Sequence, residues 1–131
     1  MNYLVDTHVL LWSFLDPDQL SANIVQLLVN ESNAVYYSPI NLWEIAIKYG
    51  LKKLNLQGIT PEEFYEKVDN SFYTCKEMSN ADIIASYRLP RYHKDPFDRF
   101  LAWEAIRNGF TLMSVDETMQ LYQKEGLKIV Y

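Results

Sequence analysis

Short apolar, β-prone runs alternate along the whole chain with segments whose apolar residues recur at helical spacing. In the first such pair, a run at residues 3–5 is followed by Val9, Leu10 and Trp12 on one helical stripe. Strands alternating with helices predict an α/β three-layer α/β/α fold with a mainly parallel central sheet. The predicted strands cover residues 3–5, 34–37, 72–74, 110–115 and 128–130.

Helix starts are marked by capping residues, several of them followed by proline at the first helical position. Gly50 and Gly109 stand where two of these helices should end. No repeat, low-complexity segment or linker interrupts the pattern, so we expect one domain over residues 1–131. The predicted helices begin after Ser21, Ser38, Thr60, Ser79 and Asp95, with one further helix after 6 and one after 116.

Composition narrows the class of protein. No apolar run approaches the ~18 residues of a membrane span, and no basic segment precedes the first apolar stretch. Cys75 is the single cysteine, which excludes a disulfide framework and a cysteine-based metal site within one chain. We therefore expect a cytoplasmic protein with no membrane segment.

Two predicted strands are followed by aspartates, Asp6 after the first and Asp116 after residues 110–115. In parallel sheets the ligand crevice lies outside the carboxyl ends of the strands. If these strands are neighbours, the two carboxylates meet at one edge of the sheet. The alternative for Asp116 is a simple N-cap of the last helix.

Glu44 interrupts a helix that is apolar on nearly every side, with Trp43 and Ile47 flanking it. One interpretation is an ion pair with Lys48 one turn later, which contributes only a few tenths of a kcal/mol. A half-buried acid requires a stronger partner, and a cation in a crevice is the second interpretation.

Asp95 and Asp98 occupy the N-cap and third positions of their predicted helix. Carboxylates there stabilise the free N–H groups and the helix dipole, so capping alone explains both. A carboxylate at a helix start can also point into a crevice, and Asp98 directly precedes the packed run 100–102.

Several carboxylates in one crevice repel one another unless a cation joins them. Oxygen ligands without cysteine or a spaced histidine pair select Mg²⁺ or Mn²⁺, and the matching chemistry is phosphodiester hydrolysis. Thr7 either holds a carboxylate in this site or caps the first helix. The single histidines His8 and His93 are assigned no catalytic role, and Asp82 is interpreted as a helix-capping acid.

Basic residues gather in two clusters on a chain whose formal net charge is −5. Residues 1–40 contain no Lys or Arg, and the clusters lie at 48–53 and 88–99. They are either phosphate contacts beside the acidic site or ordinary solvated surface. The candidate contacts with a phosphate chain are Lys48, Lys52, Lys53, Arg91 and Arg99.

Four motifs in this order resemble a PIN domain, in particular the VapC-type ribonuclease toxins of type II toxin–antitoxin pairs. The motifs are YLVDTHVLLW (3–12), SPINLWEIAIKYGLKKL (38–54), HKDPFDRFLAWEA (93–105) and LMSVDETM (112–119). The resemblance departs at Ser114, where the family often has threonine, and at Trp103, where the family usually has a small residue.

The resemblance implies a Mg²⁺- or Mn²⁺-dependent endoribonuclease that acts on RNA, forms a homodimer and is blocked by a VapB-type antitoxin protein. Thr7, Asp95 and Ser114 would be accessory residues. The catalytic and metal-binding set would be Asp6, Glu44, Asp98 and Asp116.

Two other classes of function fit parts of the pattern. A non-catalytic PIN-fold interaction domain would use the acids only as caps. A receiver-like phospho-acceptor module would use Asp6 or Asp116, but it has no need of Glu44 on a helix. Substitution of the acids separates the first alternative, because an interaction domain would lose stability and nothing else.

Overall fold

The computed structural model describes residues 1–131. Its strands are β1 (Asn2–Val5), β2 (Ala34–Tyr37), β3 (Thr74–Cys75), β4 (Thr111–Met113) and β5 (Lys128–Val130). Its helices are α1 (Thr7–Leu15), α2 (Ala22–Val29), α3 (Pro39–Gly50), α4 (Pro61–Asp69), α5 (Asn80–Ala85) and α6 (Pro96–Asn108). Three 3-10 helices complete the chain: η1 (Pro17–Gln19), η2 (Ser86–Arg88) and η3 (Glu117–Glu125).

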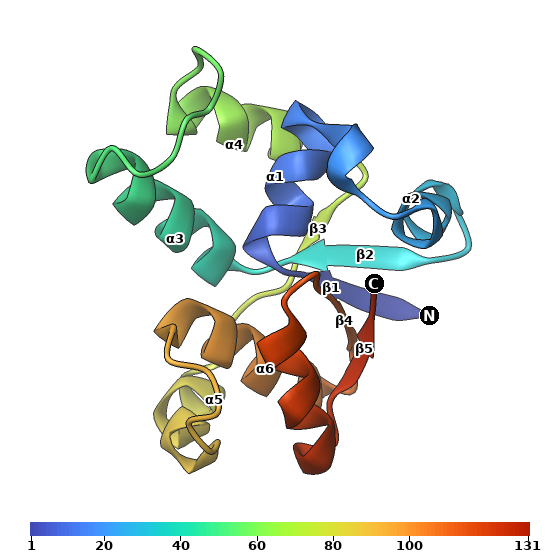
Figure 1. Cartoon of the computed structure of the whole chain (residues 1–131), viewed down its shortest axis with the longest axis vertical. Helices are drawn as coiled ribbons and strands as arrows, with labels where there is room; N and C mark the ends of the chain where they lie inside the picture. The colour runs from blue at the N-terminus through green and yellow to red at the C-terminus, as the bar shows by residue number, and fades with distance from the viewer.

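The five strands form one sheet in the order β3-β2-β1-β4-β5 (Figure 1). Every neighbouring pair is parallel, which confirms the predicted α/β architecture and extends it from a mainly parallel to a wholly parallel sheet. In the centre, Leu4 of β1 pairs with Tyr36 of β2 and Leu112 of β4. The carboxyl ends of β1, β2 and β4 therefore lie side by side at one edge of the sheet.

The predicted helix starts are confirmed by side-chain caps. Ser21, Ser38, Thr60, Ser79 and Asp95 each accept a hydrogen bond from a backbone N–H in the first turn of the following helix. These bonds satisfy N–H groups that have no partner inside the helix. Sequence and structure agree here because capping depends on neighbouring residues alone.

Three elements differ from the prediction, two strands in their bounds and one helix in its type. The edge strand β3 is displaced from 72–74 to Thr74–Cys75, because the Ser71 hydroxyl accepts the Tyr73 N–H in a turn before it. Strand β4 ends at Met113 rather than at residue 115. The chain then turns, and the Asp116 N–H donates a hydrogen bond to the Ser114 hydroxyl. The last helix is the 3-10 helix η3.

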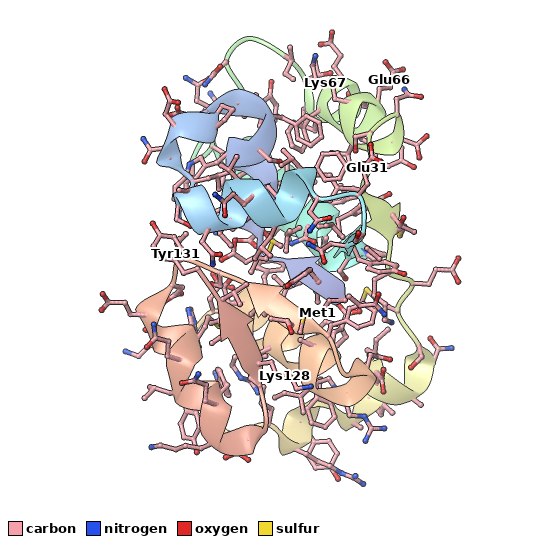
Figure 2. All side chains as sticks on the ribbon, turned by 90° about the vertical axis from the view of Figure 1, so that its right-hand side faces the viewer. Met1, Glu31, Glu66, Lys67, Lys128 and Tyr131 are labelled. Carbon is pink, nitrogen blue, oxygen red and sulfur yellow. The ribbon has the colours of Figure 1, made fainter.

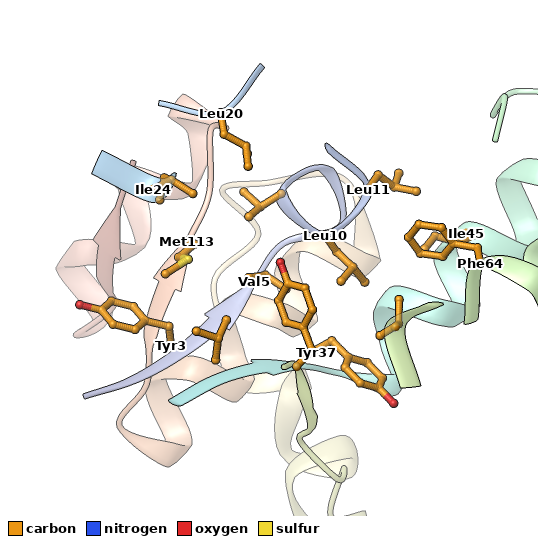
Figure 3. Packing of buried hydrophobic residues seen from close by; sticks show 14 of the residues in the cluster. Tyr3, Val5, Leu10, Leu11, Leu20, Ile24, Tyr37, Ile45, Phe64 and Met113 are labelled. Atoms are coloured by element: carbon orange, nitrogen blue, oxygen red, sulfur yellow. The ribbon is translucent and has the colours of Figure 1, made fainter. Parts of the chain in front are cut away.

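Side chains of β1 alternate between two cores, one on each face of the sheet. Tyr3 and Val5 pack with Leu10 of α1 and Met113 of β4, as Figure 3 shows. Helices α1, α2 and α4 pack on this face of the sheet and supply further residues of that core. Leu4 faces the other way, into a core built mainly by α6 and η3. The sheet thus fixes the starts of α1 and α6 relative to each other.

The outer surface of α4 carries charged side chains. On α4, Glu66 and Lys67 point away from the body of the protein (Figure 2). No helix combines the length and the apolar character that a bilayer crossing requires.

Candidate active site

Asp6 lies at the carboxyl edge of the sheet, directly after β1. Its Oδ1 accepts the Val9 N–H at 2.8 Å, so the side chain caps α1 while only 2% of the residue is exposed. Burial raises the pKa of the Asp6 carboxyl, and hydrogen bonds from Ser114 and from the Val9 amide oppose the shift. Asp6 is a charge-bearing group in a place that disfavours charge.

Asp116 lies at the same edge of the sheet, because β1 and β4 are neighbours. This is the condition under which the sequence predicted that the two carboxylates meet. It also caps η3, since its Oδ1 accepts the Thr118 N–H at 2.9 Å. Its Oδ2 lies 2.5 Å from Nε2 of His93. Although burial alone would raise it, the hydrogen bond with His93 holds the pKa of Asp116 below its ordinary value.

Glu44 projects from α3 and is 2% exposed. Its Oε1 accepts the Thr7 hydroxyl at 2.5 Å, and its Oε2 forms an ion pair with Lys48. The ion pair that the sequence offered as one interpretation is therefore present, in a buried setting. Thr7 holds a carboxylate, as its other predicted role required, and Asp6 rather than Thr7 caps α1.

Asp95 and Asp98 play different parts at the start of α6. Oδ1 of Asp95 accepts the Phe97 N–H at 2.8 Å and, more weakly, the Asp98 N–H at 3.4 Å. The Asp98 carboxylate makes no capping bond. Burial raises its pKa to about 7, and the charges of Asp95, Glu44 and Asp6 contribute to the shift. The fold thus brings these acids within electrostatic range of one another.

His93 joins two of the acids, although no catalytic role was predicted for it. Its Nε2 lies 2.5 Å from Asp116 Oδ2 and 3.3 Å from Asp98 Oδ2. Its Nδ1 accepts the Asp95 backbone N–H at 3.0 Å, so in the neutral ring the proton is on Nε2. Because Nε2 then donates, His93 is a hydrogen-bond donor to these carboxylates rather than a metal ligand in this arrangement.

A second residue that the sequence analysis missed is Asn41. It is fully buried, and its Nδ2 donates to the Thr7 hydroxyl at 3.1 Å and to the Val5 carbonyl at 3.3 Å. The only sequence signal for Asn41 was its place three residues after the cap Ser38, with which it forms a capping box. His93 had no such signal beyond lying in one of the four motifs.

A cleft of about 380 Å³ opens beside this cluster. Thr7, Glu44 and Lys48 line one part of it, and Lys53 lines another. Among the other predicted RNA contacts, Lys52 and Arg91 are exposed outside this lining, and Arg99 donates to the Leu89 carbonyl at 3.3 Å. Lys48 and Lys53 are thus the two candidates that share a cavity with Glu44.

Two other polar residues lie outside the site. His8 is exposed and packs against Trp12, with ring centroids 5.4 Å apart. Asp82 does not act mainly as a cap, because its carboxylate accepts hydrogen bonds from Arg107 and Asn108 of α6. These hydrogen bonds connect α5 to α6.

The donor set fits a hard divalent cation. All the acids present oxygen ligands, and Asp98 has its pKa raised to about 7 by burial beside like charges. A cation among these carboxylates would remove that repulsion. Oxygen-only coordination favours Mg²⁺ or Mn²⁺ over zinc.

Known structures with a similar fold include chains from two protein complexes. A chain in the crystal structure of VapBC2 from Rickettsia felis, bound to a DNA fragment from their promoter, superposes with a TM-score of 0.69. It is 20% identical, and the match covers 99% of this chain and 98% of that one. A chain of FitAcB from Neisseria gonorrhoeae superposes with a TM-score of 0.67 at 17% identity, covering 98% and 96%.

A comparison with curated protein sequences found no match. The sequence profile of the PIN domain matches residues 3–125, a segment that contains the four carboxylates and His93. This match spans nearly the whole chain, and the two structural matches agree with it in fold. The chain therefore belongs to the PIN domain family.

Proposed function

We propose that this PIN domain is a metal-dependent endoribonuclease that hydrolyses RNA phosphodiester bonds and is the toxin of a toxin–antitoxin pair. The observation that carries the proposal is the gathering of carboxylates around Asp98, whose pKa burial and neighbouring charges raise to about 7. A fold that only needed capping acids would not bring Asp98 and Glu44 close enough for their charges to interact, since neither makes a capping bond.

Asp6, Glu44, Asp98 and Asp116 would hold the Mg²⁺ or Mn²⁺ ion. When bound, the ion activates water for attack and stabilises negative charge on the phosphate. The protein's own contribution is positioning. Thr7 fixes the orientation of Glu44, and His93 holds Asp98 and Asp116 together. Ser114 supports both strand-end acids as an accessory residue.

Lys48 and Lys53 would bind phosphates of the RNA, because both line the cleft that adjoins Glu44. The net charge of −5 argues against a general nucleic-acid coat and favours local contact with a phosphate chain. An RNA substrate places the site of action in the cytoplasm.

The proposed partners are a VapB-type antitoxin, which would cover the acidic cleft, and a second copy of this chain. The similar chains reported above come from the structures of VapBC2 and FitAcB, which supports a second protein as partner. Trp43, Ile84 and Tyr87 expose apolar surface that a second copy would bury. Light scattering of the purified chain tests the homodimer, and a monomer at micromolar concentration would contradict it.

The nuclease is tested with the purified chain free of any partner. It should cleave structured RNA with Mg²⁺ or Mn²⁺ and stop when EDTA is added. Asp6→Asn should lower the rate at least ~100-fold, the scale of losing a key electrostatic group. Asparagine caps helices as well as aspartate does, so the variant should stay folded. Full activity in Asp6→Asn would refute the assignment and favour the non-catalytic interaction domain.

A further inference from the structure

Glu44 has both of its oxygens occupied by side chains of this protein. The Thr7 hydroxyl donates to Oε1 at 2.5 Å, and the Lys48 ammonium pairs with Oε2. Glu44 is 2% exposed and lines the cleft together with Thr7 and Lys48, so a cation that reaches it comes close to both groups. A carboxylate oxygen can accept a hydrogen bond and bind a cation at the same time, but a divalent cation at Glu44 would repel a positive charge held on the same carboxylate.

Thr7 is the partner that is locked in place. It is 4% exposed, and the fully buried Asn41 donates to its hydroxyl oxygen at 3.1 Å. Because that oxygen already accepts from Asn41, its own proton is directed to Glu44. Asn41 is fixed in turn by the Val5 carbonyl at 3.3 Å. Displacing Thr7 would disturb the junction of β1 with α3.

Lys48 is the partner that is free to leave. Its side chain is 34% exposed and reaches Glu44 along a flexible four-carbon stem. Its other charged contact is Asp95 Oδ2, at 3.9 Å. Lys48 also lines the cleft of about 380 Å³ that holds Lys53 at another part of its wall. A rotation of the stem carries the ammonium from Glu44 into that cleft.

We propose that Lys48 is the exchangeable counter-ion of the site, which neutralises Glu44 in the metal-free protein and turns to a phosphate of bound RNA when a divalent cation takes Glu44. The inference rests on the proposed function for its RNA half only. It assigns Lys48 two successive partners of opposite kind, a carboxylate and then a phosphate. A surface RNA contact would have the second partner alone, and a structural ion pair would have the first alone.

The test measures the affinity of the purified chain for Mn²⁺ by calorimetry at pH ~8 without RNA. Lys48→Met removes the competing ammonium and should tighten Mn²⁺ binding at least ~10-fold, since hydrogen bonds between ions are among the stronger ones. Lys48→Gln keeps a neutral donor and should tighten it less. Lys48→Arg keeps the charge and should stay near the wild type. Lys67→Met, which removes an exposed charge on α4, is the matched control and should change nothing.

A second arm measures RNA cleavage by the same variants over a range of salt concentrations. Lys48→Met should raise KM and reduce the salt slope by about 0.7, the share of one phosphate contact to a single strand. Urea denaturation tests whether each variant is folded. If Lys48→Met does not fold, Lys48→Gln takes its place in both measurements. The opposite signs of the two effects, tighter metal and weaker RNA, are what a purely structural role would not produce.

Unchanged or weaker Mn²⁺ binding in folded Lys48→Met and Lys48→Gln would overturn the counter-ion role. Tighter Mn²⁺ binding with an unchanged salt slope would overturn the transfer of Lys48 to phosphate. If the wild type binds Mn²⁺ but cleaves no RNA, the proposed function fails, whereas tighter binding in Lys48→Met would still support the exchange at Glu44.

Discussion

Asp98 should destabilise the metal-free protein at neutral and alkaline pH. The pKa of this carboxyl is raised from 3.8 to about 7, first by burial and then by the charges of Asp95, Glu44 and Asp6. A raised folded-state pKa means that the folded protein binds the proton more tightly than the unfolded chain does. The associated stability is complete below pH 3.8 and is lost as the pH rises through about 7.

The neutral isostere Asp98→Asn should remove this cost. The change in pKa corresponds to ~4 kcal/mol of unfolding free energy when Asp98 is fully ionised. Neighbouring acids can shift their own protonation to relieve part of the repulsion, so a gain of about 2–4 kcal/mol is expected. Urea denaturation in EDTA should show the gain at about pH 8 and a much smaller one at about pH 5. Glu66→Gln, an exposed residue of α4, should change the free energy of unfolding by less than about 0.5 kcal/mol at either pH.

Divalent metal should reduce the difference in stability between Asp98→Asn and the wild type. At ~100 times its dissociation constant, Mn²⁺ adds about 2.7 kcal/mol to whichever protein binds it. The wild type should gain this amount, on the order of 5 °C in Tm, and Asp98→Asn should gain less. An Asp98→Asn variant that is no more stable than the wild type in EDTA at about pH 8, or that keeps the full Mn²⁺ shift, would show that Asp98 lies outside the charged cluster.

Three further predictions follow from individual contacts. Asp95→Ala removes the cap of α6 and should lose ~1 kcal/mol of stability while it keeps measurable cleavage, whereas Asp98→Ala should abolish cleavage. Thermal melts and cleavage assays of both variants test this, and the reverse pattern would mean that Asp95 is the metal ligand and Asp98 the cap. Lys53→Met should reduce the salt slope of RNA binding by about 0.7 and Lys52→Met should not, because of these two residues only Lys53 lines the cleft. If both variants keep the salt slope of the wild type, neither lysine contacts RNA. Glu104 is 1% exposed, and burial raises its pKa from 4.5 to about 7, although Ser38 and the charge of Lys76, 3.9 Å from Oε2, oppose the shift. Glu104→Gln should therefore gain up to ~3 kcal/mol above pH 7 in urea denaturation and lose that gain towards pH 4.5, and a pH-independent difference would refute the assignment.

The sequence predicted the elements whose signals are local. Ser38 and Thr60 mark helix starts because capping involves residues two or three positions away. The edge strand Thr74–Cys75 was misplaced because two residues carry little periodicity, and its position depends on pairing with β2. Strand order was the decisive unknown for the site. The pairing of β1 with β4 brings Asp6 and Asp116 together, and these two strands are more than a hundred residues apart in the sequence.

The role of His93 could not be predicted for the same physical reason. Its contacts run to Asp116, 23 positions away, and to a backbone N–H that fixes its tautomer. A lone histidine carries no spacing that reports either contact. The burial of Glu44 was indicated by its apolar neighbours, but its hydrogen bond with Thr7 spans 37 positions and depends on the packing of α3 against α1.

Capping and metal binding are not competing explanations for the acids of this site. A carboxylate has two oxygens, and Asp6, Asp95 and Asp116 each use Oδ1 for a backbone N–H at a helix start. The cap fixes the side-chain rotamer, so the second oxygen is already oriented when a ligand arrives and loses little conformational entropy on binding. The two roles separate by substitution, since asparagine keeps the cap and removes the charge, whereas alanine removes both. If Asp6→Asn and Asp6→Ala lose metal binding equally but only Asp6→Ala loses stability, one residue performs both functions through different oxygens.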